Sequence, residues 1–347
     1  MAALKLKMPG EKDLIAAIRG RARGSSPGLR LGVGDDCAIL RPKRGEEIVV
    51  TTDFSLEGVH FRREWHTPES VGHRCLARGL SDVAAMGARP VAAFLSVAVP
   101  EELLKARRGK SWVERFFDGL MALADRFEVP LAGGDTAQAP ERACFDIVLV
   151  GAVKQGRALL RSGAKPGDLI YVTSALGGAA AELLALERNP RRFAGLTKAA
   201  EGHPHFFPEP RLDVGRKLAA MNGIHAAIDV SDGLSTDLAH ICEESGVAAE
   251  VDAAAIPAHR LAAEAKRNGW VSSALELALH GGEDYELLFT ASAEAKVPRK
   301  VAGVDVRRIG RIVRKKSRVA RVMLRLPYGE MKVLEVRGWE HFRKGSC

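Results

Sequence analysis

The chain has 347 residues, of which 46% are hydrophobic, and a formal net charge of +9, so it can bury a sizeable core, which we expect as two domains. The chain contains no apolar run long enough for a transmembrane helix, and its N-terminus lacks the apolar core of a secretion signal. Five scattered cysteines without a C-x-x-C pair favour a cytoplasmic protein with reduced thiols over a disulfide framework.

Apolar periodicity in the first half predicts alternating strands and helices. We expect strands at 46–53, 90–100 and 144–153, helices at 69–88 and 111–128, and a glycine-rich loop at 130–138. The first strand is expected to stop at Asp53. The periodicity breaks near 154–162, which predicts one domain over residues 1–155 and another over residues 156–347.

The second half continues the alternation of strands and helices. Strands are expected at 168–176, 225–230, 248–253 and 284–292, helices from 177, at 234–246 and at 272–282, and a Pro- and His-rich loop at 201–212. The predicted class is therefore α/β (or α+β), with an N-terminal mixed sheet flanked by helices and a C-terminal α/β domain.

A basic segment, residues 306–326, contains nine Lys or Arg residues and no acidic residue. A nucleic-acid or anion surface is one interpretation. The other is the solvated faces of two strands joined as a hairpin, because the basic residues partly alternate with Val, Ile and Leu. No aromatic residue interleaves to stack on bases, so we favour the solvated hairpin and expect no nucleic-acid partner.

Six short stretches place acids beside glycine or hydroxyl residues: 32–36, 51–53, 81–82, 133–135, 229–233 and 281–284. Each alone is explained by a helix cap or a turn. Together they supply adjacent acids that would repel one another if they were buried without cations. Carboxylate and hydroxyl oxygens suit Mg²⁺, and glycine lets backbone amides approach phosphate. The set predicts a phosphate site with several Mg²⁺ ions.

Three other site types fail on spacing. "RRGKS" (107–111) lacks the first glycine of a Walker loop, and Cys37 replaces the third glycine of a dinucleotide fingerprint. His240 stands where a calcium loop starting at Asp229 needs a bidentate Glu. The histidines of "HPH" (203–205) are interpreted as ordinary surface residues. A nucleotide enzyme without a Walker loop remains.

The order of these motifs resembles the thiamine-monophosphate kinase family, within the superfamily of aminoimidazole ribonucleotide synthetase. The matching stretches are "GVGDDCAIL", "TTDFSLEGVHF", "LSDVAAMGARP", "GGDT", "IDVSDGLSTDL", "GGEDYELLFT" and "GWEHF". The resemblance implies ATP and thiamine monophosphate as reactants, Mg²⁺ as cofactor, and a homodimer built through N-terminal strands. It implies direct in-line phosphoryl transfer without a covalent nucleophile.

The resemblance also implies roles for individual residues. Magnesium ligands would be Asp36, Thr51, Thr52, Asp53, Asp82, Asp135, Asp229 and Asp232. ATP would be contacted by Phe117, Gly134, Asp135, Arg161 and Ser231, and the thiamine substrate by His60, Glu283 and Trp339. Alternatives stay open for three of them: His60 as a loop histidine, Arg161 as a strand-end charge and Trp339 as a C-terminal core anchor.

Two residues depart from the family pattern. Gly79 stands where the family usually has Asn, and Phe117 stands where a tyrosine often touches the nucleotide, which affects nucleotide affinity or selectivity more than reaction type. Rival functions are a hydrogenase-maturation factor using Cys347, a selenophosphate synthetase, a nucleotide sensor without turnover, and a nucleic-acid-binding protein. No cysteine precedes Cys37, which argues against the selenophosphate enzyme.

Overall fold

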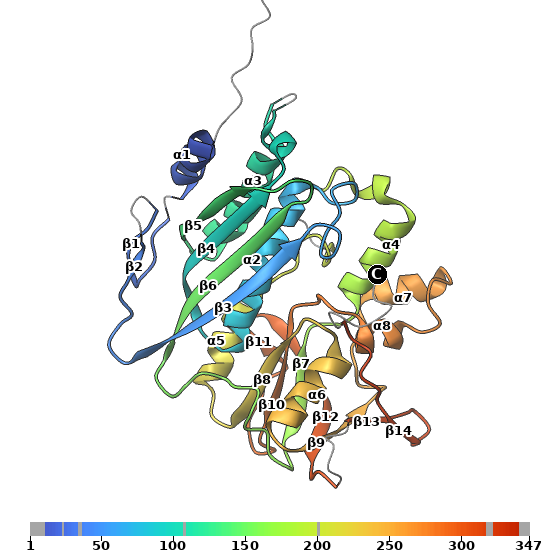
Figure 1. The fold of residues 1–347 in the computed structure, drawn as a ribbon. Coiled ribbons are helices and arrows are strands. Elements are labelled where there is room, and N and C mark those ends of the chain that lie inside the picture. Colours follow the sequence, from blue (N-terminus) through green and yellow to red (C-terminus); the bar gives the residue numbers. More distant parts are fainter. Residues whose placement is uncertain are drawn as a thin grey trace, which may run out of the picture.

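The computed structural model describes residues 11–22, 24–33, 37–106, 109–199, 202–316 and 322–339. Two sheets organise these residues, one above the other in Figure 1, with helix α2 (Pro68–Ala85) against the first sheet and beside the second. Helix α1 (Glu11–Arg21) and the short strands β1 (Leu29–Leu31) and β2 (Ile39–Leu40) lie at the edge of the first sheet.

The first sheet is mixed, as predicted. Its strands are β3 (Glu46–Leu56), β4 (Arg89–Val99), β5 (Leu131–Gln138) and β6 (Cys144–Lys154), in the order β3-β6-β4-β5. The β4–β5 pair is parallel and the other two pairs are antiparallel.

Two expectations for the first sheet were wrong. Strand β3 does not stop at Asp53, because its ladder with β6 continues to Leu56. The glycine-rich stretch 130–138 is not a loop: β5 pairs with β4, placing Gly134 opposite Leu95 and Asp135 opposite Ser96. The neighbouring strand β4 supplies hydrogen-bond partners along β5, and the local composition of residues 130–138 does not predict this pairing.

Helices α2 and α3 (Trp112–Arg126) pack closely against each other because two glycines face across their contact. A Cβ on Gly72 would lie 1.9 Å from the Phe116 carbonyl oxygen, and a Cβ on Gly119 would lie 1.9 Å from the Glu69 carbonyl oxygen. Any larger residue would separate the helices. The Thr67 hydroxyl caps α2, and Ser111 with Glu114 forms a capping box on α3. A 3₁₀ turn, η1 (Glu101–Leu104), precedes α3.

The second sheet holds eight strands of the described chain. They are β7 (Leu169–Thr173), β8 (Ile224–Val230), β9 (Ala248–Asp252), β10 (Glu286–Ala291), β11 (Lys300–Val301), β12 (Val304–Val313), β13 (Val322–Arg325) and β14 (Met331–Val333). The order is β14-β13-β9-β12-β7-β10-β8, with β11 on β12. The expected basic hairpin was wrong, because β9 lies between β12 and β13 and pairs with both.

The helices around this sheet are α4 (Gly178–Arg188), α5 (Leu212–Ala220), α6 (Leu234–Glu244), α7 (Arg260–Arg267) and α8 (Ala274–His280), with a 3₁₀ turn η2 (Pro190–Phe193). Helices α5 and α7 were not predicted. Each is shorter than three full turns, so its apolar periodicity, although strong, is diluted in a window of about 11 to 18 residues.

One buried apolar cluster joins the two sheets through α2. Leu76 and Leu80 of α2 belong to the same cluster as Leu218 of α5 and Phe289 of β10. This packing holds the ends of β8 and β10 against α2, and so brings acids from the two halves of the chain together.

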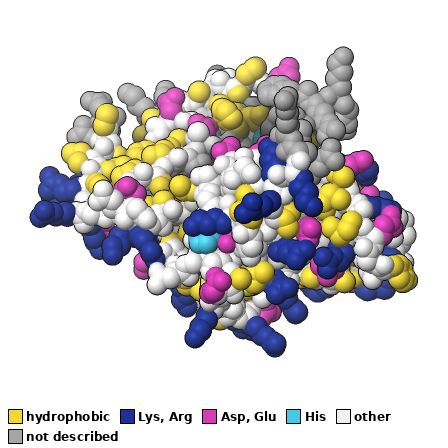
Figure 2. Space-filling model, turned by 90° about the horizontal axis from the view of Figure 1, so that it is seen from below, with side chains coloured by type: hydrophobic (Ala, Val, Ile, Leu, Met, Phe, Trp, Pro, Cys, Tyr) yellow, Lys and Arg dark blue, Asp and Glu magenta, His cyan; other side chains and the backbone are white. Residues whose placement is uncertain are grey.

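Strand β12 of the basic segment has one solvated side: Val306, Ile309 and Ile312 are buried, whereas Arg307 and Arg311 are exposed, and the pairing is irregular between Arg308 and Gly310. On the face seen in Figure 2, Lys and Arg side chains form separate groups interspersed with acidic and apolar ones. Among the described residues, no helix is both long and apolar enough to cross a bilayer.

Candidate active site

Three predicted acids converge from three elements. Asp53 lies on β3, Asp82 on α2 and Asp229 at the end of β8. The Thr51 hydroxyl donates a short hydrogen bond to Asp82 Oδ2, and the Ser81 hydroxyl donates to Asp229 Oδ2 at 2.7 Å. These hydroxyls fix the carboxylates in place, so the predicted cluster exists within one chain.

The electrostatics of this cluster call for cations. Burial, reinforced by the neighbouring Asp82, raises the pKa of Asp53 and of Asp229 to about 7. Burial also raises the pKa of Asp82, although Thr51 and Arg161 oppose the shift. Asp53 Oδ2 is buried and has no hydrogen-bond partner in the described part of the chain. Crowded carboxylates with an orphaned oxygen fit a site for hard divalent cations such as Mg²⁺.

Two predicted ligands lie apart from the cluster. Side chains alternate along a strand, so the Thr52 side chain points to the other face of β3 from Asp53. There the Thr52 hydroxyl donates to Asp146 Oδ1 at 2.7 Å. Asp135 lies on β5, the opposite edge of the sheet, and its Oδ1 accepts the Thr136 amide. Asp36 lies outside the described residues.

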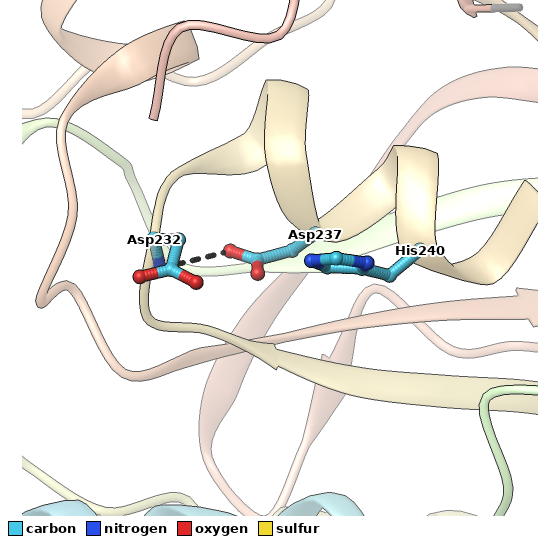
Figure 3. Close-up of side chains that lie close together, drawn as sticks. All are labelled: Asp232, Asp237 and His240. Atoms are coloured by element: carbon cyan, nitrogen blue, oxygen red, sulfur yellow. Dashed lines mark hydrogen bonds between the residues drawn. The ribbon is translucent and has the colours of Figure 1, made fainter. Parts of the chain in front are cut away.

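A second acidic group surrounds the turn between β8 and α6 (Figure 3). Ligand atoms of Asp232, Asp237 and His240 lie within 4.8 Å of one another. Asp237 Oδ2 accepts the backbone amides of Ser231, Asp232 and Gly233, at 3.1, 3.2 and 3.0 Å. Burial and the charges of Asp229 and Asp232 hold the pKa of Asp237 well above its usual range. These three side chains can hold a divalent metal with one nitrogen ligand.

Asp237 and His240 were not predicted as site residues. Their i, i+3 spacing on a helix puts both side chains on one face, and that signal was available in the sequence. Ser231, a predicted ATP contact, lies on the same turn. Arg161, another predicted ATP contact, follows β6, and its charge acts on both Asp82 and Asp229. Its side chain is exposed, and its charge lowers the pKa of both carboxyls.

A cavity of about 820 Å³ lies between α1 and the β4–β5 edge of the first sheet. Its lining includes the predicted ATP contacts Phe117, Gly134 and Asp135, together with Ile15 and Ile18 of α1. Its volume and its mixed polar and apolar wall suit a nucleotide. Gly134 has φ near 150°, and a Cβ there would lie 1.9 Å from the Leu95 carbonyl oxygen, so the backbone needs glycine.

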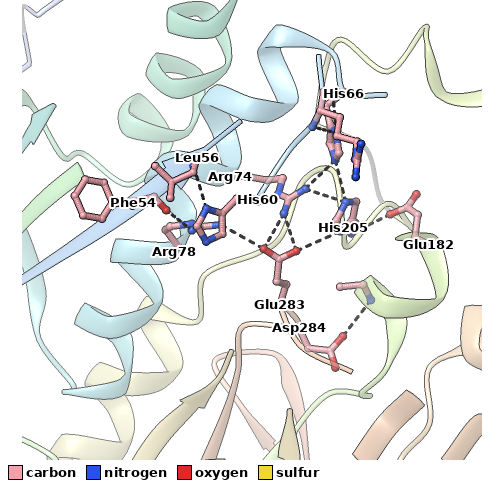
Figure 4. Close-up of polar contacts among 12 residues, drawn as sticks. Phe54, Leu56, His60, His66, Arg74, Arg78, Glu182, His205, Glu283 and Asp284 are labelled. Atoms are coloured by element: carbon pink, nitrogen blue, oxygen red, sulfur yellow. Dashed lines mark hydrogen bonds and ion pairs between the residues drawn. The ribbon is translucent and has the colours of Figure 1, made fainter. Parts of the chain in front are cut away.

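A charge-matched cluster surrounds Glu283 (Figure 4). Arg74 Nη2 donates to both Glu283 carboxylate oxygens, at 2.7 and 2.6 Å, and Arg78 Nη2 lies 3.3 Å from Oε1. Burial alone would raise the pKa of Glu283, but Arg74, His205 and Arg78 hold it well below its usual range. The carboxylate is therefore ionised and held rigidly.

The predicted substrate contact His60 follows the C-terminal end of β3, which Arg78 links to Glu283. His60 Nδ1 accepts the Leu56 amide at 3.0 Å, and Arg78 Nη1 donates to the Phe54 carbonyl at 2.5 Å. His60 and Glu283 are thus brought to one region. Arg74 and Arg78 were not predicted as site residues. Their i, i+4 spacing puts both on one face of α2, but surface charges on helices share that spacing.

The surface interpretation of "HPH" was wrong for His205. Its side chain is 3% exposed, and its Nε2 lies 3.0 Å from His66 Nε2 and 2.8 Å from Arg74 Nη1. Burial and the Arg74 charge lower the pKa of His205 to about 4. The neutral imidazole faces Arg74 with Nε2, and its Nδ1 lies 3.4 Å from Glu283 Oε2.

Trp339 is not a core anchor, because it is 43% exposed. Its backbone amide donates to the Asp232 carbonyl at 3.3 Å. The residue therefore lies on the same turn as the second acidic group.

Comparison with known proteins decides the family. Residues 34–153 match the AIR synthase related protein N-terminal domain, and residues 165–322 match its C-terminal domain. A thiamine-monophosphate kinase of Bacillus subtilis is 35% identical over 344 residues, covering 96% of this chain and 99% of that protein. The chain belongs to the thiamine-monophosphate kinase family.

Solved structures of thiamine-monophosphate kinases have the same fold. The enzyme of Stenotrophomonas maltophilia is 37% identical, with a TM-score of 0.72 over 91% of this chain and 96% of that one. The complex of AaThiL with AMPPCP and TMP is 28% identical, with a TM-score of 0.70 over 99% of this chain and 100% of that one. The family is one of phosphotransferases, and this chain is an enzyme of that class.

Proposed function

We propose that this protein transfers the γ-phosphoryl group of ATP to thiamine monophosphate, giving thiamine diphosphate and ADP, with Mg²⁺ as cofactor. The observation that carries the proposal is the convergence of Asp53, Asp82 and Asp229, with one orphaned carboxylate oxygen, beside the Arg74–Glu283 cluster. The AaThiL complex with an ATP analogue and TMP supports this choice of reactants for a family member of the same fold.

Different residues of the acid cluster would bind the metal and orient its ligands. Asp53, Asp82 and Asp229 would hold Mg²⁺, which when bound neutralises the repulsion between two phosphate-bearing reactants. Thr51 and Ser81 keep Asp82 and Asp229 oriented. The acceptor oxygen is already anionic at neutral pH, so no strong base is required and we propose direct in-line transfer without a phosphoenzyme.

The acceptor would be recognised at His60, Glu283 and Trp339. Glu283 is held as a carboxylate by Arg74, and so suits a group that donates hydrogen bonds or carries positive charge. The exposed indole of Trp339 offers a face for an aromatic heterocycle. Thiamine monophosphate has both features.

A homodimer would complete the site. Asp53 and Gly134 lie in one row across the sheet, three strand spacings apart, which is roughly 14 Å. Asp135 therefore cannot share an ion with Asp53 within one chain. The outer face of β3 exposes Ile48, Val50 and Phe54, at 40%, 64% and 56%, and suits burial against a second copy. We propose that this pairing brings the β5 edge of one copy to the β3 edge of the other.

The activity is tested by offering the purified protein MgATP with thiamine, with thiamine monophosphate, or with an aminoimidazole precursor, and measuring ADP and product. Of the three acceptors, we expect only thiamine monophosphate to be consumed. We also expect a metal chelator to abolish the activity. Asp53→Asn should lower turnover by several orders of magnitude, whereas Asp213→Asn, at an exposed surface pair on α5, should not. Equal turnover by both variants would overturn the proposal.

A further inference from the structure

The C-terminal segment 334–339 is fixed at two places. Leu334 is buried in the second core, and its amide donates to the Val322 carbonyl at 2.8 Å. Four residues later, the Gly338 amide donates to the Thr236 hydroxyl at 3.1 Å. The next amide, of Trp339, donates to the Asp232 carbonyl. The segment therefore ends on the turn that carries Asp232.

Glycine is required at position 338 for this docking. A Cβ on Gly338 would lie 2.2 Å from the Asp232 carbonyl oxygen and 2.2 Å from Thr236 Oγ1. Those distances are far inside van der Waals contact, and both obstacles belong to a rigid turn. The backbone there is not in the left-handed region, so the requirement is one of space alone.

The same turn holds the segment of Glu283 from another side. The Glu283 amide donates to the Ser231 carbonyl at 2.7 Å, and a Cβ on Gly282 would lie 2.6 Å from that oxygen. Two consecutive carbonyls, of Ser231 and Asp232, thus hold the segments that carry Glu283 and Trp339. Asp237 fixes the amides of the turn from within.

We propose that Thr236 and Gly338 are positioning residues for acceptor recognition. They dock the C-terminal segment on the Asp232 turn and so set the Trp339 indole at a fixed place relative to Glu283. Neither residue touches the reacting atoms. This inference rests on the proposed function, because Trp339 is taken there as the contact for the aromatic ring of the acceptor.

The proposal predicts a selective kinetic defect. A displaced Trp339 weakens binding of the acceptor ring, but it leaves the nucleotide cavity at α1 and β5 unchanged. Loss of one hydrogen bond and the associated order corresponds to a roughly three- to tenfold rise in the KM for thiamine monophosphate. The KM for ATP should stay within twofold of wild type.

The test pairs two substitutions at Thr236 and two at glycine. Thr236→Val removes the hydroxyl while keeping the shape, and Thr236→Ser keeps the hydroxyl. Gly338→Ala introduces the clash, and Gly195→Ala is the control, because a Cβ there meets nothing within 4 Å. Each variant is measured for both KM values, melting temperature and hydrogen exchange of the peptide spanning 334–339.

Thr236→Val and Gly338→Ala should speed exchange in this peptide and raise only the KM for thiamine monophosphate, while Thr236→Ser and Gly195→Ala match wild type. Faster exchange without a KM change would reduce the docking to a structural role and overturn the proposal. Unchanged exchange in both variants would also overturn it. If wild type does not use thiamine monophosphate, the proposed function fails, and exchange still decides whether these residues hold the segment.

Discussion

Two charged regions lie one turn apart on helix α2, and they differ in charge balance: one gathers like charges and the other pairs opposite charges. Around Asp82, one buried and two half-buried carboxylates lie close together, and the pKa of two of them rises to about 7. Around Arg74 and Arg78, a single carboxylate is fully matched and its pKa falls well below the usual range. The first region is incomplete within one chain, because it needs cations and, in our account, a second subunit. The second is complete and preformed.

Mixing inactive subunits should give the largest change in turnover. It separates the site residues that one chain supplies from those that its partner supplies. Asp53→Asn and Asp135→Asn should each be inactive alone. Dimers containing one of each would have one intact site, so co-expressed chains that pair at random should regain about a quarter of wild-type turnover. Asp53→Asn mixed with Asp82→Asn is the control, because both acids serve the same chain's cluster, and it should regain nothing.

No recovery in the first mixture, with dimers confirmed by their mass, would contradict the shared site. It would then follow that Asp135 acts elsewhere, since its own chain keeps it at the opposite sheet edge from Asp53.

Glu283→Gln should destabilise the charge-matched region strongly. It leaves Arg74 and Arg78 buried with their anion removed, at a cost of about 3–5 kcal/mol in the free energy of unfolding. Because the folded-state pKa is lowered, the wild-type advantage is present above the unfolded pKa and is lost as the pH falls below it. Urea unfolding at pH 7 and at acid pH measures both effects.

Glu264→Gln is the matched control for that substitution. Glu264 and Arg267 are 4.0 Å apart and more than half exposed, so their pair should contribute less than about 1 kcal/mol. Equal losses for Glu283 and Glu264 would show that the Arg74 cluster is not the tight ion pair described here.

Asp229→Asn should raise the free energy of unfolding, whereas Glu283→Gln lowers it. A carboxyl whose folded-state pKa is raised costs stability once the pH exceeds its unfolded value, and the cost grows until about pH 7. In metal-free buffer at pH 8, we expect the variant to be more stable than wild type by about 1–3 kcal/mol. The difference should shrink at pH 5, and a destabilised variant at both pH values would contradict the like-charge description.

The smallest predicted effect is the pH dependence of metal stabilisation. Mg²⁺ requires ionised ligands, so each carboxyl with a pKa near 7 lowers affinity by about tenfold per pH unit below it. For Asp53 and Asp229 together, the rise in melting temperature caused by Mg²⁺ should be clear at pH 8 and much weaker at pH 6. A stabilisation independent of pH would point to ions bound at other, freely exposed acids.

The sequence predicted the acid cluster better than the cluster next to it. Asp53, Asp82 and Asp229 stand in motifs that share one design, so their convergence could be inferred before their positions were known. Arg74 and Arg78 lie between motifs, and nothing local distinguishes them from surface charges on a helix. Their role depends on Glu283, more than 200 residues away.

The errors in the fold have the same origin. Residues 130–138 look like a loop because glycine is a poor strand former, yet β4 supplies a complete partner. The basic strands look like a hairpin because they are neighbours in sequence, yet β9 pairs between them. His205 looks exposed in its Pro-rich surroundings, but it packs against His66 and Arg74. Long-range pairing decides each case, and local patterns do not contain it.

The most direct measurement is a titration of metal ions into wild type and into the double variant Asp53→Asn, Asp229→Asn. Mn²⁺ is followed by its magnetic resonance signal at pH 8, with and without an ATP analogue. We expect saturable binding to wild type that tightens with the nucleotide and is lost in the variant. Equal binding by both proteins, or none by wild type with nucleotide present, would contradict it.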